Sequence, residues 1–567
     1  MAETLFDDAA ARRAFRWFML LALVVLAAGL GLRDPWPPDE PRFALVARQM
    51  VESGQWLFPH RGMEFYGDKP PMLMWLEAGF FELFRSWRLA FLLPSLAAGL
   101  GTLALVYDLG RRLWNARAGL AAAVLLLSAM QFVGEVKHAQ IDPLLMFWIT
   151  LANWGLLRHC LRGPDWRAYW LGCFAAGLGV ITKGVGVLAL LMLVPYALAR
   201  RWAWIPREAA AGDGRRWAGG ALAFLAAVAL WLAPMLITAY GLRTPDHLAY
   251  VRDILFHQTA DRYANSWAHA APFWFFVPVM IRDWFPLCLL FIPMVPRWRE
   301  ALRGRDARVL LPLLWWALVL VFFSIPRGKR EVYLLPVLPM AALLMGPYVG
   351  SLLRTRWLSR LGFALALVAG MAWLGGGLWA LLAHPKVAQR LAEGYELAEG
   401  GRGLWLAVIA VGVVFLLAAA VGRVRHGAWA FLGGIAAAWV VWSFATYPLM
   451  NANQSTLGVM QKADAQIGPD GELGLVAWRE ELLLQARRPA AEFGFTRGWP
   501  EQMRDALAWQ AQAPGRRWVL VNGEALQPSL CVDPAKAVRV GVANRNVWWM
   551  FDGSAVLPGC VAGRAGQ

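Results

Sequence analysis

Long apolar runs recur along the chain from Phe15 to Met450, and short polar loops separate them. Most of these runs have about the 17–25 residues that a helix needs to cross a bilayer. After Met450 the long runs stop. The pattern predicts an α-helical polytopic membrane domain over residues 1–450 and a second domain over residues 451–567. About 13 transmembrane helices are expected, near 15–33, 89–110, 118–133, 141–158, 168–182, 184–199, 217–240, 273–295, 309–325, 332–352, 361–382, 404–422 and 428–448.

The segment 451–567 has the mixed pattern of a small α/β domain. Alternating apolar positions predict strands at Leu473–Trp478, Trp518–Val521 and Ala537–Val542. Helices are expected at Arg479–Arg488 and Glu501–Gln510.

Five cysteines fall into two groups. Cys531 and Cys560 lie in the C-terminal domain, where an oxidising compartment would let them pair. Two free thiols are an equally open alternative. Cys160, Cys173 and Cys288 lie at or inside the membrane and are expected to be packing residues.

Composition supports a membrane protein, because 59% of the residues are hydrophobic and only 16% are charged, against about a quarter charged in soluble domains. The net charge of +17 comes from arginines that cluster in every second loop. This is the positive-inside pattern, and it argues against a nucleic-acid partner. It places the N-terminus on the cytoplasmic side and the C-terminal domain on the opposite, outer side. The first run follows Arg12, Arg13 and Arg16 without a convincing cleavage site, so a retained helix is expected.

Polar residues gather in the loops on the opposite, outer side. A surface helix is expected from Glu40 to Glu52, with Asp39 at its start. Asp39 has two compatible interpretations, a helix cap and a catalytic carboxylate. Further along the same loop, Lys69 is a candidate to hold phosphate, and Asp68 is available to a divalent metal.

Further outer segments carry charged side chains that are costly in an apolar setting unless they have a partner. A single tight turn holds Lys137, His138 and Asp142, and Lys183 interrupts a long apolar stretch. Lys183 either extends to the membrane interface or binds an anion. In the later loops, His257 is a weak metal-ligand candidate, and cations that suit an anionic ligand stand at Arg262, Arg327, Lys329 and Arg330.

The motifs resemble the GT-C glycosyltransferases of the protein mannosyltransferase superfamily (glycosyltransferase families 39 and 83), and most closely the bacterial 4-amino-4-deoxy-L-arabinose lipid A transferases. The resemblance covers most of residues 15–450, and the tail matches in placement more than in motif. It is carried by Asp39-Glu40-Pro41-Arg42, Tyr66-Gly67-Asp68-Lys69-Pro70, Asp142-Pro143, Thr182-Lys183-Gly184, Ala271-Pro272-Phe273-Trp274 and Phe323-Ser324-Ile325-Pro326-Arg327-Gly328-Lys329.

The resemblance implies a GT-C fold and an inverting transfer from an undecaprenyl-phosphate sugar donor to a periplasmic acceptor such as lipid A. Asp39 would be the main catalytic carboxylate, with Asp142 in support. Asp68 and His257 would match metal-site positions, although the family's usual residue at the first is glutamate, and no organic cofactor is expected. Phosphate would be held by Arg42, Lys69, Lys183 and Arg262, beside the outer cations Arg327 and Lys329.

Two other classes compete with this interpretation. A lipid-linked sugar transporter or flippase would explain many helices, but the two halves show no internal repeat or matching broken helices. A carrier-binding protein without activity would not need Asp39 and Asp142. Within enzymes, transfer of another sugar to a protein, O-antigen or other glycan is the alternative.

Overall fold

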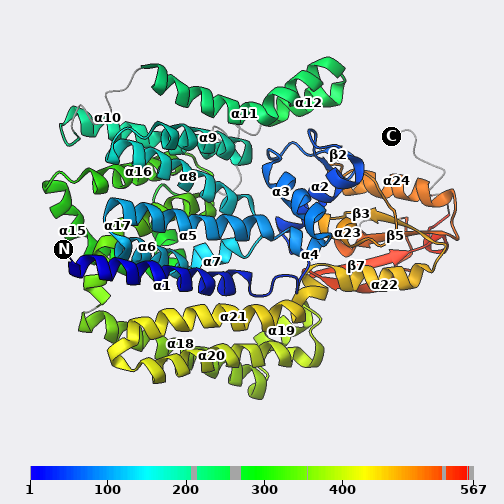
Figure 1. Cartoon of the computed structure of the whole chain (residues 1–567). Helices are drawn as coiled ribbons and strands as arrows, with labels where there is room; N and C mark the ends of the chain where they lie inside the picture. Colours follow the sequence, from blue (N-terminus) through cyan, green and yellow to red (C-terminus); the bar gives the residue numbers. More distant parts are fainter. Residues whose placement is uncertain are drawn as a thin grey trace.

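The computed structural model describes residues 2–205, 214–255, 270–353, 355–526, 531–558 and 560. Figure 1 shows a body of long helices with the N-terminus at one end and the C-terminal α/β domain seated at the other. The helices of this body run roughly along one direction, which is the arrangement expected of a polytopic membrane domain.

Eight helical stretches among the described residues are long and apolar enough to cross a membrane. They are Trp87–Leu113 (α4, Trp87–Ala90, with α5, Leu93–Leu113), Ile141–Arg162 (α8), Gly214–Leu242 (α11), Ala307–Ser324 (α16), Glu331–Leu353 (η5, Glu331–Val337, with α17, Leu338–Leu353), Arg356–Ala383 (α18), Ala398–Gly422 (η6, Ala398–Gly401, with α20, Arg402–Gly422) and Val424–Gln454 (η7, Val424–His426, with α21, Gly427–Gln454).

Two of the predicted helices are each broken into two bent segments. The stretch predicted near 118–133 is α6 (Ala116–Ser128) followed by α7 (Met130–Val136), bent by 70°. The stretch predicted near 273–295 is α14 (Phe276–Asp283), then η4 (Leu287–Leu290) and α15 (Phe291–Arg303), bent by 106°. Counting each bent pair as one span gives up to ten.

Three further elements lie where the pattern predicted helices. They are α1 (Ala2–Ala27), α9 (Trp166–Lys183), and η1 (Val185–Met192) continuing into α10 (Leu193–Arg201). The total of about 13 spans stays a prediction. Helix α1 ends before the predicted residue 33, because Gly29 and Gly31 adopt positive φ, which a helix does not accommodate.

A layer of short elements covers the end of the body that faces the C-terminal domain. It contains α2 (Glu40–Ser53), the hairpin of β1 (His60–Arg61) and β2 (Glu64–Phe65), and α3 (Met72–Phe84). Phe43, Val46, Ala47 and Met50 of α2 pack with α3 in a buried cluster that also contains residues of α11 (Gly214–Leu242). Helices α12 (Pro245–Arg252) and α19 (Lys386–Gly394) lie in other loops between the long helices.

The C-terminal domain is a mixed five-stranded sheet of order β4-β3-β5-β7-β6. The three predicted strands are confirmed, and the prediction lacked β4 and β7. The strands are β3 (Glu472–Val476), β4 (Ala490–Glu492), β5 (Arg517–Asn522), β6 (Val538–Ala543) and β7 (Asn546–Phe551). The helices are α22 (Leu457–Ile467), α23 (Glu480–Gln485), α24 (Trp499–Ala511), α25 (Gly523–Leu526) and η8 (Gly553–Ala555).

The cysteines settle as two classes. Cys531 and Cys560 form a disulfide in the C-terminal domain. Cys160 and Cys173 are buried and Cys288 is half-buried, and all three are free. The expectation that those three pack in the membrane domain agrees with this burial.

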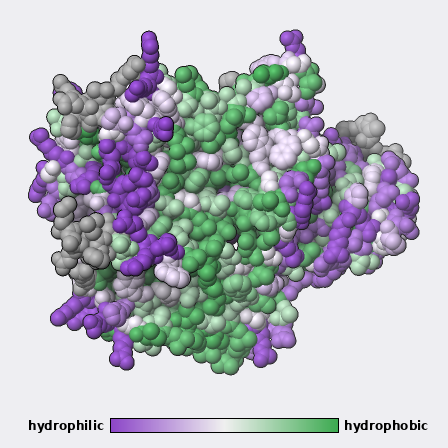
Figure 2. All heavy atoms as spheres, in the orientation of Figure 1, coloured by the Kyte–Doolittle hydropathy of each residue, from purple (hydrophilic) through white to green (hydrophobic). Residues whose placement is uncertain are grey.

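The surface of the helical body carries a broad apolar area between two polar ends (Figure 2). Large side chains such as Trp17, Ile292 and Val421 are more than 70% exposed there. Apolar exposure on this scale is unfavourable in water and suits contact with lipid. The chain is therefore a membrane-spanning protein whose charged ends lie outside the apolar layer.

Candidate active site

Helix α2 sets the geometry around Asp39. Asp39 precedes the helix and Arg42 lies three residues later, so both side chains fall on one face. The Asp39 carboxylate makes no capping hydrogen bond to the helix, so its interpretation as a side-chain cap is wrong. It lies 3.5 Å from Arg42 Nη1 and 3.5 Å from Arg330 Nη2 instead. Two cations therefore hold this carboxylate at the end of the body that faces the C-terminal domain.

The β1–β2 hairpin and the C-terminal domain extend this group of charges. Arg61 Nη1 lies 3.6 Å from an Asp68 oxygen and 3.5 Å from a Glu480 oxygen. The Arg42 Nε donates a hydrogen bond to the same Glu480 carboxylate at 3.1 Å. The result is a continuous set of alternating charges, called here the Asp39 cluster, made of Asp39, Arg42, Arg61, Asp68, Arg330 and Glu480.

A second pair lies where two packed helices meet. Asp142 stands in the first turn of α8 and Lys183 ends α9, and these helices pack side by side. Lys183 Nζ lies 2.6 Å from an Asp142 oxygen and 5.1 Å from the centre of the Tyr333 ring. Lys183 therefore has a carboxylate partner within the chain, and its two alternatives, extension to the interface and binding of an anion, both stay predictions.

The loop after α16 brings three predicted cations to the same end. Arg327 is exposed, whereas Lys329 is buried and donates to the backbone carbonyls of Ala271 and Pro326. Lys329 thus pins this loop to the segment before α14. Arg330, which reaches Asp39, also lies among the charged neighbours of Glu135, together with Asp142 and Lys183. The loop therefore connects the Asp39 cluster with the Asp142–Lys183 pair.

Three other candidate residues have internal partners. Glu40 forms a fully buried ion pair with Arg33, and the pKa of its carboxyl lies below the usual range: burial alone would raise it, but the Arg33 charge outweighs that effect. Lys137 donates to the backbone carbonyls of Val25 and Ala28 at the end of α1. The His138 ring bonds the Gly134 carbonyl. These contacts assign a structural role to each side chain.

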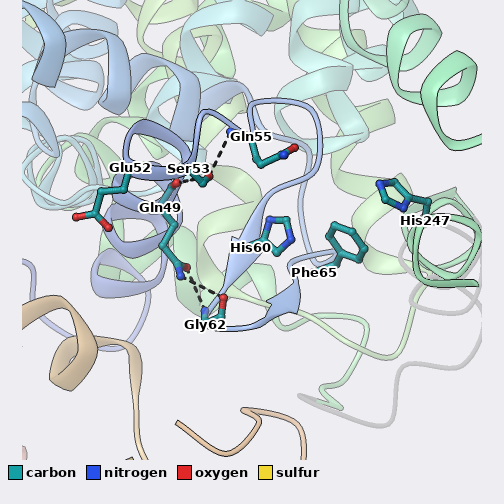
Figure 3. Close-up of a pocket in the computed structure, with 8 residues that line it drawn as sticks. All are labelled: Gln49, Glu52, Ser53, Gln55, His60, Gly62, Phe65 and His247. Carbon is teal, nitrogen blue, oxygen red and sulfur yellow. Dashed lines mark hydrogen bonds between the residues drawn. The ribbon is translucent and has the colours of Figure 1, made fainter. Parts of the chain in front are cut away.

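Beside the Asp39 cluster lies a cavity of about 480 Å³ (Figure 3). His60 and Phe65 are cross-strand partners on the hairpin face that lines it, and the His247 ring lies 5.1 Å from Phe65. Gln49 fixes the hairpin by exchanging two hydrogen bonds with the Gly62 backbone. Burial lowers the pKa of His60. Because side chains alternate along a strand, Arg61 points to the opposite face, toward the C-terminal domain.

The chain is similar to known proteins in both sequence and fold. Residues 68–236 match the family model described as dolichyl-phosphate-mannose-protein mannosyltransferase. The undecaprenyl phosphate-alpha-4-amino-4-deoxy-L-arabinose arabinosyl transferase 2 of Sodalis glossinidius (strain morsitans) is 32% identical over 393 residues, which cover 67% of this chain and 68% of that protein. The chain belongs to this aminoarabinose transferase family.

Another member of the family, from Pseudomonas aeruginosa (strain LESB58), is 33% identical over 380 residues, 62% of this chain and 65% of the relative. The chain thus matches just under two thirds of the length of the Pseudomonas aeruginosa relatives. The crystal structure of ArnT from Cupriavidus metallidurans bound to undecaprenyl phosphate superposes with a TM-score of 0.74 at 23% identity, covering 96% of this chain and 100% of that one. This confirms the predicted GT-C fold.

Binding of a divalent metal ion by this chain stays a prediction. Among residues 2–205, 214–255, 270–353 and the other described ranges, no three His, Cys, Asp or Glu side chains come together as metal ligands. Asp68 lies beside Arg61, and Lys69 Nζ donates to the Asp68 carbonyl. His257 and Arg262 lie outside the described residues.

Sequence reasoning missed two members of the Asp39 cluster as site residues. Arg330 was predicted among the cations of its loop, but Arg61 and Glu480 belong to no recognised motif. Glu480 lies 438 residues from Arg42, and only the docking of the C-terminal domain brings the two together. A sequence pattern carries no signal for such a contact.

Proposed function

We propose that this protein transfers 4-amino-4-deoxy-L-arabinose from an undecaprenyl-phosphate donor to lipid A. One observation carries the proposal: the Asp39 carboxylate is held between Arg42 and Arg330 at the end of the membrane domain that also bears the Asp142–Lys183 pair. Family membership supplies the donor and the sugar, since the relatives are named for both.

The reaction breaks the bond between C1 of the sugar and the donor phosphate oxygen, and it forms a bond from C1 to an acceptor oxygen. The electron pair of the broken bond leaves with the polyprenyl phosphate. Cations that face this phosphate stabilise the growing negative charge. Arg42 and Lys69 are assigned to this role, and Lys183 to the phosphate of donor or acceptor.

Asp39 is assigned to the reacting centre, with Asp142 in support. A carboxylate there stabilises positive charge that develops at C1 as the leaving group departs. A lipid A phosphate is already ionised and needs little base catalysis. A hydroxyl acceptor would need a base, and Asp39 would accept its proton.

The second candidate is transfer of a sugar to a protein or other glycan. The match of residues 68–236 to a protein mannosyltransferase model favours it. Because such acceptors offer a hydroxyl group, this alternative makes a stronger demand on Asp39 as a base.

The proposed orientation puts the N-terminus in the cytoplasm and the C-terminal domain in the periplasm of the inner membrane. The arginines support this orientation, because they cluster in alternate loops, as the positive-inside pattern requires of cytoplasmic loops. The Cys531–Cys560 disulfide supports it too, because such bonds persist in oxidising compartments.

The test uses purified protein in nanodiscs with undecaprenyl-phosphate aminoarabinose and lipid A, and mass spectrometry follows the acceptor. Wild type is expected to add the sugar, and Asp39→Asn to lose this activity. Asp306→Asn is the matched control. Asp306 caps the start of α16, the helix whose last turn precedes the Arg327 loop. An asparagine can still cap there. Equal product from Asp39→Asn and the control would remove Asp39 from the chemistry.

A further inference from the structure

The C-terminal domain contributes one buried carboxylate to the Asp39 cluster. Glu480 begins α23, and its side chain is 7% exposed. It contacts Arg42 at 3.1 Å and Arg61 at 3.5 Å. Arg42 in turn lies 3.5 Å from Asp39, and Arg61 lies 3.6 Å from Asp68. Each arginine therefore bridges the acid of the C-terminal domain and an acid of the loop after α1.

We propose that Glu480 is a positioning residue for the transfer reaction: its carboxylate keeps Arg42 turned partly away from Asp39. The proposal rests on the proposed function, because that function assigns Arg42 to phosphate and Asp39 to the reacting centre. Glu480 itself touches neither substrate; it acts through Arg42 and Arg61.

Competition for one guanidinium explains the effect. The contact from Arg42 to Glu480 is shorter than its contact to Asp39, 3.1 Å against 3.5 Å. When the Glu480 charge is removed, the contact loses its charge-assisted part, and Arg42 pairs more closely with Asp39. A closer pair neutralises the carboxylate and withdraws the cation from the phosphate.

The charge balance of the cluster gives an opposite effect on binding. Its three acids, Asp39, Asp68 and Glu480, balance its three arginines. Replacing Glu480 with glutamine leaves one positive charge in excess, which favours an anion. Turnover is therefore expected to fall while phosphate binding holds or tightens. Simple loosening of the C-terminal domain would not give this split.

The domain stays docked without the Glu480 charge, because other contacts hold it. Leu45 of α2 lies in the core of the C-terminal domain. Met63 N donates to Glu492 at 2.6 Å, and Thr496 Oγ1 donates to Glu64 at 3.0 Å. Thr496 thus offers a matched control: its contact also joins the hairpin to the C-terminal domain but involves neither Arg42 nor Arg61.

The experiment compares wild type, Glu480→Gln, Glu480→Asp and Thr496→Ala as full-length protein in nanodiscs. It measures kcat and KM for the donor, and Kd for undecaprenyl phosphate. Glu480→Gln is expected to lower kcat by about tenfold, the effect of one charged hydrogen bond, with Kd unchanged or tighter. Glu480→Asp keeps the charge on a shorter arm and should fall between it and wild type. Thr496→Ala should match wild type.

Two results overturn the inference: wild-type kcat in Glu480→Gln, or an equal loss of kcat in Thr496→Ala. If Glu480→Gln does not fold, the test uses Glu480→Asp. A kcat of Glu480→Asp equal to that of Thr496→Ala would contradict the positioning role of Glu480. Failure of the proposed function looks different, since wild type itself then transfers no sugar. Transfer by wild type that Glu480→Gln retains in full contradicts only the role of Glu480.

Discussion

The Arg33–Glu40 pair makes the sharpest stability prediction. Arg33 is 0% and Glu40 2% exposed, and the two side chains make paired hydrogen bonds. Glu40 also accepts from Trp36 N at 2.8 Å and Ala139 N at 2.9 Å. One carboxylate thus joins the loop after α1, the helix α2 and the turn before α8. We predict that Glu40→Gln destabilises the protein strongly.

The magnitude follows from the burial. Removing one partner of a fully buried pair leaves the other charge uncompensated, which costs about 3–5 kcal/mol. The Trp36 and Ala139 amides donate to different oxygens of Glu40, so the single oxygen of glutamine can accept from only one of them, and this loss adds to that of the stranded Arg33 charge. Arg33→Met combined with Glu40→Gln removes the stranded charge and should recover much of the stability. Methionine fills the space among the Trp36, Phe91 and Tyr447 rings.

Thermal unfolding in detergent, followed by intrinsic fluorescence, compares the variants with Glu52→Gln. Glu52 is on the same helix and pairs with Arg48, but it is 57% exposed, so its pair is worth about 0–1 kcal/mol at most. The expected order of midpoints is wild type and Glu52→Gln highest, the double variant next, and Glu40→Gln lowest. A double variant no more stable than Glu40→Gln would refute the argument from the stranded charge.

Three further predictions concern other parts of the chain. Lys183→Met and Asp142→Asn should each lower kcat/KM by about tenfold or more, and the double variant no further, because they act as one pair; steady-state kinetics of the three variants checks this. Burial raises the pKa of Glu481 to about 7, so stability should fall as pH rises from about 4.5 to 7, by about 3 kcal/mol at most; unfolding midpoints of Glu481→Gln should lack this fall. Cys531→Ser opens the loop to Cys560 and should cost about 3–4 kcal/mol; maleimide labelling of wild type in intact cells should require a reductant.

The sequence allowed the membrane domain, the position of the C-terminal domain and part of the candidate site to be predicted. The lengths of apolar runs and the positions of arginine-rich loops depend on local composition, so they can be predicted without knowing any tertiary contact. Asp39, Asp142 and Lys183 stood out separately because charged groups beside apolar helices are costly without partners, and only the structure pairs Asp142 with Lys183.

The rest depended on contacts between distant segments. Glu40 and Lys137 looked like site residues because a sequence gives no sign of the buried partners that occupy them. Glu480 looked like an ordinary residue at a helix start, although docking places it on Arg42. Charged residues could be found from the sequence, but their partners decide whether they serve structure or chemistry.

The two broken spans show why apolar periodicity alone predicted straight helices. A break in a membrane helix frees backbone groups that lipid cannot satisfy. Here the breaks satisfy each other: Met130 N, at the start of α7, donates to the Phe285 carbonyl between α14 and η4 at 3.0 Å. Gln131 accepts from the Trp284 indole at 2.8 Å and donates to the Glu331 carbonyl. These contacts hold the polar turn after α7 and the Arg330 loop together, and Arg330 in turn pairs with Asp39.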